Sequence, residues 1–347
     1  MKTLKTVLIY ILLISAICSG QSLEERVKAL EDWKPKVDSA LGFSVPIEPI
    51  DTLLPKPIYE GIVMNSINQD CFIYSSPFIR NGIWTCYVNC GGTILQATSP
   101  NGLNSWTLKP TTGSFYGPVI YVNEIFRGSA HKWYNGQVTS YFYGSLNGID
   151  WSATSADWTQ NSGEDRCLIW ENSLNLYRSY IRVRPIPRTI GYSESRDFYN
   201  WSRIVEILKP DAIDGNRIQF YQMSVIHPAA GYFGLLNTYR VGDAGQDVEQ
   251  SPPYTELEHT SDLQIVFSTN GKDNWLRLNN RKVFIPRQPG VKQQFATWCV
   301  IGDYVYIYTI CSKRRHTQWD DLYNTAGNYF YSERYKISLT DLYKYLQ

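Results

Sequence analysis

From about residue 59 to the end of the chain, hydrophobic positions fall in short runs of aromatic and β-branched residues separated by Gly, Asn and Pro. Runs of this kind are typical of short strands joined by tight turns. The pattern therefore predicts that residues 59–347 form an all-β domain.

Within this region one motif recurs four times: a strand that ends in Ser, a short polar turn, and a Trp that opens the next strand. The copies run from Ser99 to Trp106, Ser145 to Trp151, Ser195 to Trp201 and Ser268 to Trp275. Asn-Gly, present in three of them, supplies the positive φ angles that a tight β-turn needs. The Trp is expected to close the turn by packing against a neighbouring sheet.

The spacing of the motif predicts the architecture. The first three tryptophans are about 45 to 50 residues apart, the length of one four-stranded propeller blade, and a longer insertion precedes the fourth. A fifth unit, residues 293–336, lacks the motif. Together they predict a five-bladed β-propeller.

Strand direction indicates which face would carry a site. If the strands of a blade are A to D from inside to outside, the A–B and C–D turns lie on one face, and the B–C loops and D–A links lie on the other. The long segments Val241–Thr260 and Ser312–Gly327 fall between B and C strands. Long loops gathered on one face of a rigid scaffold are a common place for binding.

The first 58 residues differ from the rest. Lys2 and Lys5, the apolar stretch 7–17 and the small residues before Gln21 predict a signal peptide over residues 1–20. Its apolar stretch is about half of the roughly 20 residues that span a bilayer, so we expect no membrane span. The protein is accordingly expected to be secreted, periplasmic or on the cell surface. Lipidation at Cys18 is the alternative.

Residues 21–42 are predicted to contain a short helix. Leu23, Val27, Leu30 and Val37 recur near heptad spacing, and Pro35 interrupts them. Residues 22–38 would either mediate homo-oligomerisation or form a helix that packs on the propeller. Residues 43–58 contain four prolines and are predicted to be a stiff linker.

Charge and cysteine content narrow the partners. The formal net charge of +1 provides no basic surface for nucleic acid. Six cysteines would remain after cleavage, which permits disulfides in an exported chain but equally fits free buried thiols. Cys86 and Cys90 lie about 13 Å apart if they share one strand, too far for a bridge, which needs about 7 Å or less.

Acidic residues precede several predicted A strands. Asp70 opens the first blade, Asp165 the third, and Asp214 precedes the fourth, while Glu124 lies either near the axis or in a turn. Carboxylates that converge on one funnel would suit glycosidic cleavage, which needs a proton donor and a nucleophile or base. The alternative is that each Asp is simply a good turn residue.

Arginine and tryptophan side chains offer binding groups. Arg182 and Arg188 belong to the B–C connection of the third blade and could bind sugar hydroxyls or a carboxylate, or form structural ion pairs. Trp170 and Trp319 could stack on sugar rings or pack in the core. No metal-ligand spacing and no phosphate-binding glycine loop occur, so neither a metal nor another cofactor is expected.

The stretch Arg188–Ser195 running to Asn200-Trp201 resembles a blade signature of five-bladed propeller glycoside hydrolases of families 32 and 43. Ser268–Gly271 followed by Trp275 and Arg277 is similar to a strand pair of their relatives. The resemblance covers about residues 59–336 and implies a funnel with one catalytic carboxylate early in blade one and two from later blades. Asn68-Gln69-Asp70-Cys71 stands where family 32 has Asn-Asp-Pro.

Three functions follow as hypotheses. The first is a glycoside hydrolase acting on an oligo- or polysaccharide with axial carboxylates as the acid and base. The second is a non-catalytic carbohydrate-binding or adhesive propeller. The third is a structural surface-assembly protein.

Overall fold

The computed structural model describes residues 54–65, 71–112, 117–134, 137–159, 162–183, 187–241, 259–314 and 330–347. Clustering of the chain separates residues 1–53 from a compact unit over Leu54–Gln347. The predicted signal peptide, helix and most of the linker, together with Asp70 and Trp319, lie outside the described residues.

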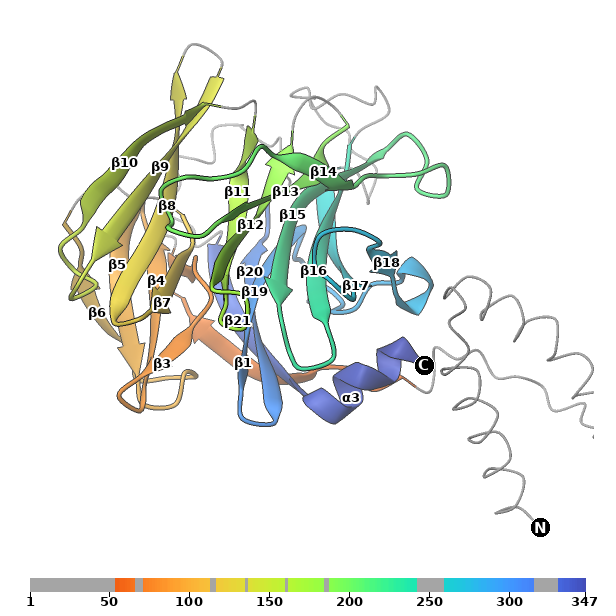
Figure 1. Cartoon of the computed structure of the whole chain (residues 1–347). Helices are drawn as coiled ribbons and strands as arrows, with labels where there is room; N and C mark the ends of the chain where they lie inside the picture. The colour runs from red at the N-terminus through yellow and green to blue at the C-terminus, as the bar shows by residue number, and fades with distance from the viewer. Residues whose placement is uncertain are drawn as a thin grey trace, which may run out of the picture. The chain divides into compact units, whose positions relative to one another are not determined.

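The described strands form five antiparallel sheets, and the prediction of a five-bladed β-propeller is confirmed (Figure 1). Blade one consists of β2 (Cys71–Ile73), β4 (Ile83–Cys90), β5 (Thr93–Ser99) and β6 (Thr107–Pro110), and blade two of β7 (Val119–Val122), β8 (Ile125–Tyr134), β9 (Gln137–Ser145) and β10 (Ser152–Thr159). Blade three consists of β11 (Ser162–Glu171), β12 (Leu176–Val183), β13 (Thr189–Ser195) and β14 (Val205–Leu208). Blade four consists of β15 (Ile218–Ile226), β16 (Tyr232–Arg240), β17 (Thr260–Ser268) and β18 (Leu276–Arg277). A short extra strand, β3 (Phe78–Arg80), pairs with β4.

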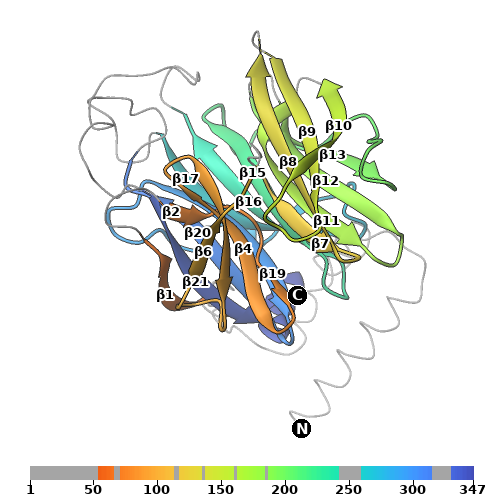
Figure 2. The same cartoon turned by 90° about the vertical axis from the view of Figure 1, so that its left-hand side faces the viewer.

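Blade five joins the two ends of the propeller chain. It consists of β19 (Gln293–Ile301), β20 (Tyr304–Ser312) and β21 (Phe330–Ser338), and its outer strand is β1 (Ile58–Met64), which pairs antiparallel with β21. Between blades five and one, the amide of Ile73 donates to Ser332 Oγ at 2.9 Å. Figure 2 shows the strands of blade one beside those of blade five. The ring is therefore closed by a strand from the start of the unit.

The helices among the described residues are short. A 3-10 turn, η2 (Asn279–Arg281), follows blade four, and α3 (Leu339–Tyr343) with η4 (Lys344–Leu346) follows blade five. Ser338 caps α3 because its Oγ accepts from the Asp341 amide. No described helix is long and apolar enough to cross a membrane.

The four repeated turns share one hydrogen-bond pattern. The Ser hydroxyl that ends each C strand accepts from the amide three residues on, at 2.8–3.0 Å in all four copies. The Asn or Asp two residues after that Ser accepts from two further amides of the turn, as Asn147 does from Ile149 and Asp150. The predicted C–D turns are thus confirmed, and side-chain oxygens take the place of backbone acceptors.

These turns also join neighbouring blades. Tyr87, Tyr180 and Tyr308 each stand on a B strand, and each phenol donates to the carbonyl of the turn glycine of the next blade. The acceptors are Gly148, Gly271 and Gly102, at 2.8, 3.0 and 2.9 Å. The turn therefore closes one hairpin and fixes the blade beside it.

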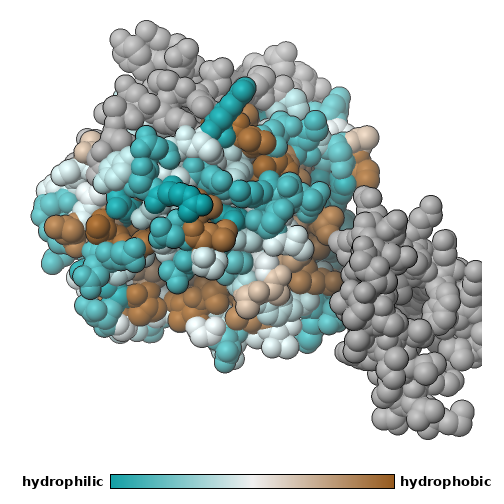
Figure 3. Space-filling model, viewed as in Figure 1, coloured by the Kyte–Doolittle hydropathy of each residue, from teal (hydrophilic) through white to brown (hydrophobic). Residues whose placement is uncertain are grey.

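Hydrophobic packing fills the space between blades. The largest cluster joins blades four and five to the C-terminal helix through Phe233, Trp298, Tyr335 and Leu342. On the outside, Figure 3 shows hydrophobic residues interspersed with hydrophilic ones over the face in view. The core is thus a ring of inter-blade layers.

Candidate functional site

The ends of the strands define two faces of the propeller. We call the end carrying Val183 and Thr189 the loop end, because B strands finish and C strands start there. The end carrying Glu171 and Leu176 is the turn end, because A–B and C–D turns lie there. The sequence prediction placed the site at the loop end.

At the loop end of blades three and four, two arginines lie beside two tyrosines. This arginine–tyrosine cluster consists of Arg182, Arg188, Gln219, Tyr221, Tyr239 and His259. Arg182 lies near the end of β12 and Arg188 directly before β13. Gln219 and Tyr221 lie in the first half of β15, Tyr239 near the end of β16, and His259 directly before β17. Strand pairing aligns the members within each blade, and the packing of blade three against blade four brings the two sets together.

Both arginines of the cluster are buried. Arg182 is 0% exposed, and its guanidinium lies 3.9 Å from the centre of the Tyr221 ring. Arg188 is 2% exposed, approaches the same ring at 5.3 Å, and donates to Gln219 Oε1 at 2.6 Å. A desolvated guanidinium over an aromatic face is stabilised by the ring quadrupole, so these two charges are held in fixed positions.

The tyrosines extend the cluster toward blade five. The Tyr239 hydroxyl lies 2.9 Å from His259 Nδ1, and Tyr221 packs against Tyr239 and Phe295 with ring centres 5.7 and 5.6 Å apart. Guanidinium forks can bind carboxylates and paired hydroxyls in two-point contacts. Because both guanidinium groups are buried, the cluster forms a fixed polar layer beneath the surface at the loop end.

Asp165 belongs to the same region of the backbone. It lies in β11 between Ser162, paired with Val183, and Arg166, paired with Ile181, where the ladder shifts register. The chain at Asp165 therefore runs beside the end of β12 that carries Arg182.

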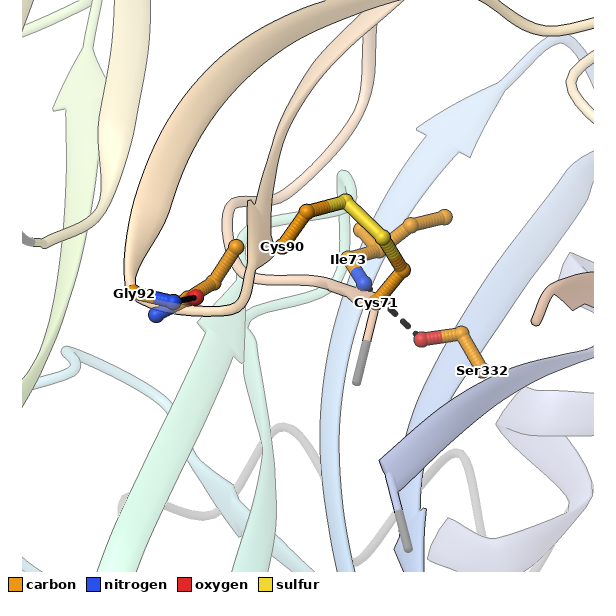
Figure 4. The surroundings of a disulfide bond; sticks show 6 residues. Cys71, Ile73, Cys90, Gly92 and Ser332 are labelled. Carbon is orange, nitrogen blue, oxygen red and sulfur yellow. Dashed lines mark hydrogen bonds between the residues drawn. A yellow bond between two sulfur atoms is a disulfide. The ribbon is translucent and has the colours of Figure 1, made fainter. Parts of the chain in front are cut away.

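A disulfide joins the first two strands of blade one. Cys71, directly after Asp70, is bonded to Cys90, and their Cα atoms are 4.2 Å apart. Figure 4 shows this bridge beside the hydrogen bond from Ile73 to Ser332. Of the six cysteines among the described residues, the other four are free thiols, three of them buried. The start of β2 is thus fixed covalently at the loop end.

Asp214 lies on the flank of blade four. Its carboxylate forms an ion pair with Arg277 of the outer strand β18 at 2.5 Å, and both side chains are about 5% exposed. Arg281 lies 3.4 Å from its other oxygen. These residues line a pocket of about 440 Å³ together with Arg240 and Asp262. The carboxylate of Asp214 is therefore held by two guanidinium groups.

Two further predicted residues lie at the turn end. Glu124 is exposed in the A–B turn between β7 and β8, with a φ of +64°. Trp170 stands near the end of β11, half-buried, with its ring centre 4.5 Å from that of Tyr177. Neither residue lies at the end that carries Arg182 and Arg188.

A buried carboxylate at the turn end is fully engaged by donors. Glu171 accepts from Tyr232 and from Ser173, and its Oε2 lies 2.5 Å from His227 Nδ1. Burial raises the pKa of Glu171, but these hydrogen bonds and the neighbouring His227 outweigh it and lower the pKa overall. Glu171 therefore serves to join blades three and four.

The sequence analysis missed Gln219, Tyr221, Tyr239 and His259. Their positions gave a signal for a shared face, since Tyr221 lies in the first half of one strand and Tyr239 lies near the end of the next. Within the part of the chain that the structure describes, no group of three His, Cys, Asp or Glu side chains could hold a metal ion.

Comparison with known proteins defines the class of fold. The chain is similar to the catalytic domain of the Coprinopsis cinerea family GH62 α-L-arabinofuranosidase, with a TM-score of 0.54, 11% identity, and coverage of 82% of this chain and 97% of that one. It is similar to the Xanthomonas citri GH43_1 enzyme complexed with xylose, at a TM-score of 0.54, 8% identity, and coverage of 81% and 90%. It is also similar to the Bombyx mori GH32 β-fructofuranosidase, with a TM-score of 0.51, 11% identity, and coverage of 90% of this chain and 66% of that one.

These similar structures are five-bladed propeller glycoside hydrolases, and this chain is a divergent example of their fold. At 8–11% identity, the similarity establishes the fold alone. No protein-family model matches the sequence, and no curated protein matches it.

Proposed function

We propose that this protein hydrolyses glycosidic bonds of an oligo- or polysaccharide at the loop end of its propeller. The observation that carries the proposal is the arginine–tyrosine cluster, which lies beside the strand of Asp165 on a fold shared with saccharide-cleaving enzymes. Arg182 and Arg188 would bind sugar hydroxyls or a carboxylate, and Trp319 would stack on a sugar ring.

The proposed chemistry uses two carboxylates. Asp70 and Asp165 precede or open inner strands of blades one and three, so one can protonate the leaving oxygen while the other acts as nucleophile or activates water. The disulfide at Cys71 supports this role of Asp70, because it restricts the backbone directly after it. Asp214, bound by Arg277, would contribute structure.

We also propose that the protein is exported from the cytoplasm. The disulfide between Cys71 and Cys90 supports a secreted, periplasmic or cell-surface location, since such bonds persist in oxidising compartments. Homo-oligomerisation through residues 22–38 remains a separate prediction.

The test is product analysis after incubation with a panel of polysaccharides. Asp70→Asn and Asp165→Asn should each lower turnover by about 100-fold or more, since each removes an acid–base or nucleophilic group. Asp341→Asn, which alters a half-buried aspartate in the C-terminal helix α3, should leave turnover unchanged. Full activity in both loop-end variants would refute the proposal.

A non-catalytic carbohydrate-binding propeller is the second candidate. It is favoured by the location of two predicted carboxylates, since Asp214 is paired with Arg277 and Glu124 lies at the turn end. Binding to saccharides on a glycan array without released sugar, equal in wild type and in Asp70→Asn, would select this function over hydrolysis.

A further inference from the structure

A second pocket lies between blades two and three, away from the arginine–tyrosine cluster. It has a volume of about 380 Å³, within the range of small-ligand sites. Its walls come from β8, β9, the C–D turn of blade two, β10 and the C–D turn of blade three. We call it the blade-two pocket; it is lined by Ile125, Arg127, Gly144–Asn147, Asp150, Ser152 and Tyr199.

One cross-strand row explains why the pocket is open. Arg127 pairs with Gly144, and Gly144 pairs with Ser152, so the three residues lie side by side on the same sheet face. Gly144 has no side chain to fill the space between its neighbours. The sheet surface beside the Arg127 guanidinium is therefore left bare.

Arg127 is held by aromatic rings rather than by an acid. Its guanidinium lies 5.7, 5.2 and 5.6 Å from the ring centres of Tyr177, Phe198 and Tyr199. Among the described residues it forms no ion pair, and its buried Nε has no hydrogen-bond partner. Its position is thus fixed, and its Nη groups, rather than the buried Nε, are the donors that a ligand would meet.

The turn of blade three departs from the other three copies at this pocket. Where they have Gly, it has Phe198, whose φ of +71° is rare for a bulky residue. Phe198 is fully buried and packs on Phe142, Tyr177 and Trp201. Backbone strain of this kind tends to occur at functional positions. The next residue, Tyr199, then lines the pocket.

The remaining groups suit a sugar ring. Tyr199 and Leu146 are 44% and 76% exposed, so both offer apolar surface to the C–H face of a sugar. Each oxygen of Asp150 accepts one hydrogen bond, from Thr112 or Asn147, at 3.1 or 2.7 Å. A carboxylate can accept about four. Asp150 can therefore also accept from ligand hydroxyls while Arg127 donates to them.

We propose that the blade-two pocket is a second saccharide-binding site, in which one sugar ring packs on Tyr199 and its vicinal hydroxyls are bound by Arg127 and Asp150. This inference rests on the proposed function for its ligand class, but it concerns a different place on the molecule. Such a site would hold a polymeric substrate while another part of it is cleaved.

The test is a glycan array of neutral and acidic oligosaccharides, followed by calorimetric titration of the full chain with the strongest ligand. Tyr199→Ala and Arg127→Gln should each weaken binding at one site by ten-fold or more. Tyr304→Ala is the matched control, since that tyrosine on blade five is 43% exposed, and it should bind as wild type does.

The two proposals fail separately. Asp70→Asn should abolish turnover and keep the binding that Tyr199→Ala removes, whereas Tyr199→Ala should keep turnover of a small soluble substrate. Absence of turnover in wild type, with Tyr199-dependent binding intact, would overturn only the proposed hydrolysis. Unchanged binding in a folded Tyr199→Ala protein, or no array binding by wild type, would overturn the second site.

Discussion

At the residue scale, the ionisable groups differ in what surrounds them. Asp214 is buried against Arg277 on the flank of blade four, whereas Glu333 on β21 is buried with neutral donors, Tyr335 at 2.9 Å and the Cys311 thiol at 3.6 Å. Partners of opposite charge stabilise a buried carboxylate, and burial without them destabilises it. The two residues should therefore respond differently to neutralisation.

Asp214→Asn should lower the free energy of unfolding by about 3–5 kcal/mol, because it leaves Arg277 buried without its anion. Urea denaturation of the variant and wild type measures the change. Glu206→Gln serves as the control, since Glu206 pairs with Lys209 on the surface and such pairs contribute less than about 1 kcal/mol. Equal effects of the two substitutions would contradict a structural role for Asp214.

The pH dependence of stability tests Glu333. Burial raises the pKa of Glu333 above its ordinary 4.5, so the folded protein holds this proton more tightly than the unfolded chain. The stability that this provides is present below the unfolded pKa and is lost as pH rises through the folded pKa. Glu333→Gln should therefore gain stability relative to wild type as pH rises above about 4.5, as measured by urea denaturation.

Asp341 provides the opposite sign as a control. Hydrogen bonds from Lys344 and Ser338 lower its pKa, so the stability it provides is lost as pH falls. The free energy of unfolding of Asp341→Asn should thus be close to that of wild type in acid, and should fall below it as pH rises. A difference between Glu333→Gln and wild type that stays constant with pH would contradict the assignment for Glu333.

At the element scale, the C–D turns both close hairpins and connect blades. A local hydrogen-bond pattern in each turn presents a glycine carbonyl to a tyrosine of the preceding blade. This makes the inter-blade contact depend on a turn that short-range sequence determines. The same turn in blade three carries Phe198 and Tyr199, and a pocket opens beside it.

Tyr180→Phe should cost about 1–2 kcal/mol of unfolding free energy, because it removes the donor and leaves the buried Gly271 carbonyl without this bond. Tyr308→Phe should cost a similar amount, and the double variant should show the sum, since the two bonds lie in different interfaces. Tyr304→Phe, at an exposed tyrosine, should change stability by less than about 0.5 kcal/mol. Urea titrations measure all four, and a neutral Tyr180→Phe would contradict the inter-blade role.

Much of this element-scale structure was predictable because it is local. The Ser and Trp of each turn, and the Asn-Gly that three of the four contain, lie within about eight residues, so sequence alone indicates them. The A and B strands of blade two were harder to assign, because only Asn123 and Glu124 separate β7 from β8. The positive φ of Phe198 was implied by the repeat, because it stands where the other three turns have Gly, whereas its packing on Phe142 and Tyr177 follows from tertiary structure.

At the scale of the whole molecule, the blades form a ring that closes through β1 and β21. This pairing joins residues nearly 280 positions apart in sequence, such as Ile58 and Lys336, so local patterns did not predict it. Likewise, the partner of Cys71 could not be deduced from spacing, because several pairings of six cysteines were open. The loop end itself was predictable from strand direction, and so was the face on which Tyr221 and Tyr239 lie, but their contacts with Arg182 and Arg188 depend on how blades three and four pack.

The proposed function requires a saccharide to bind at the loop end, between the inner strands of blades one and three and the arginine–tyrosine cluster. The most direct test is a crystal structure of the Asp70→Asn protein soaked with a polysaccharide fragment that the wild type cleaves. The account predicts a sugar ring at the loop end, with its glycosidic oxygen between residues 70 and 165. Sugar density only in the blade-two pocket, or only on the flank beside Asp214, would contradict it.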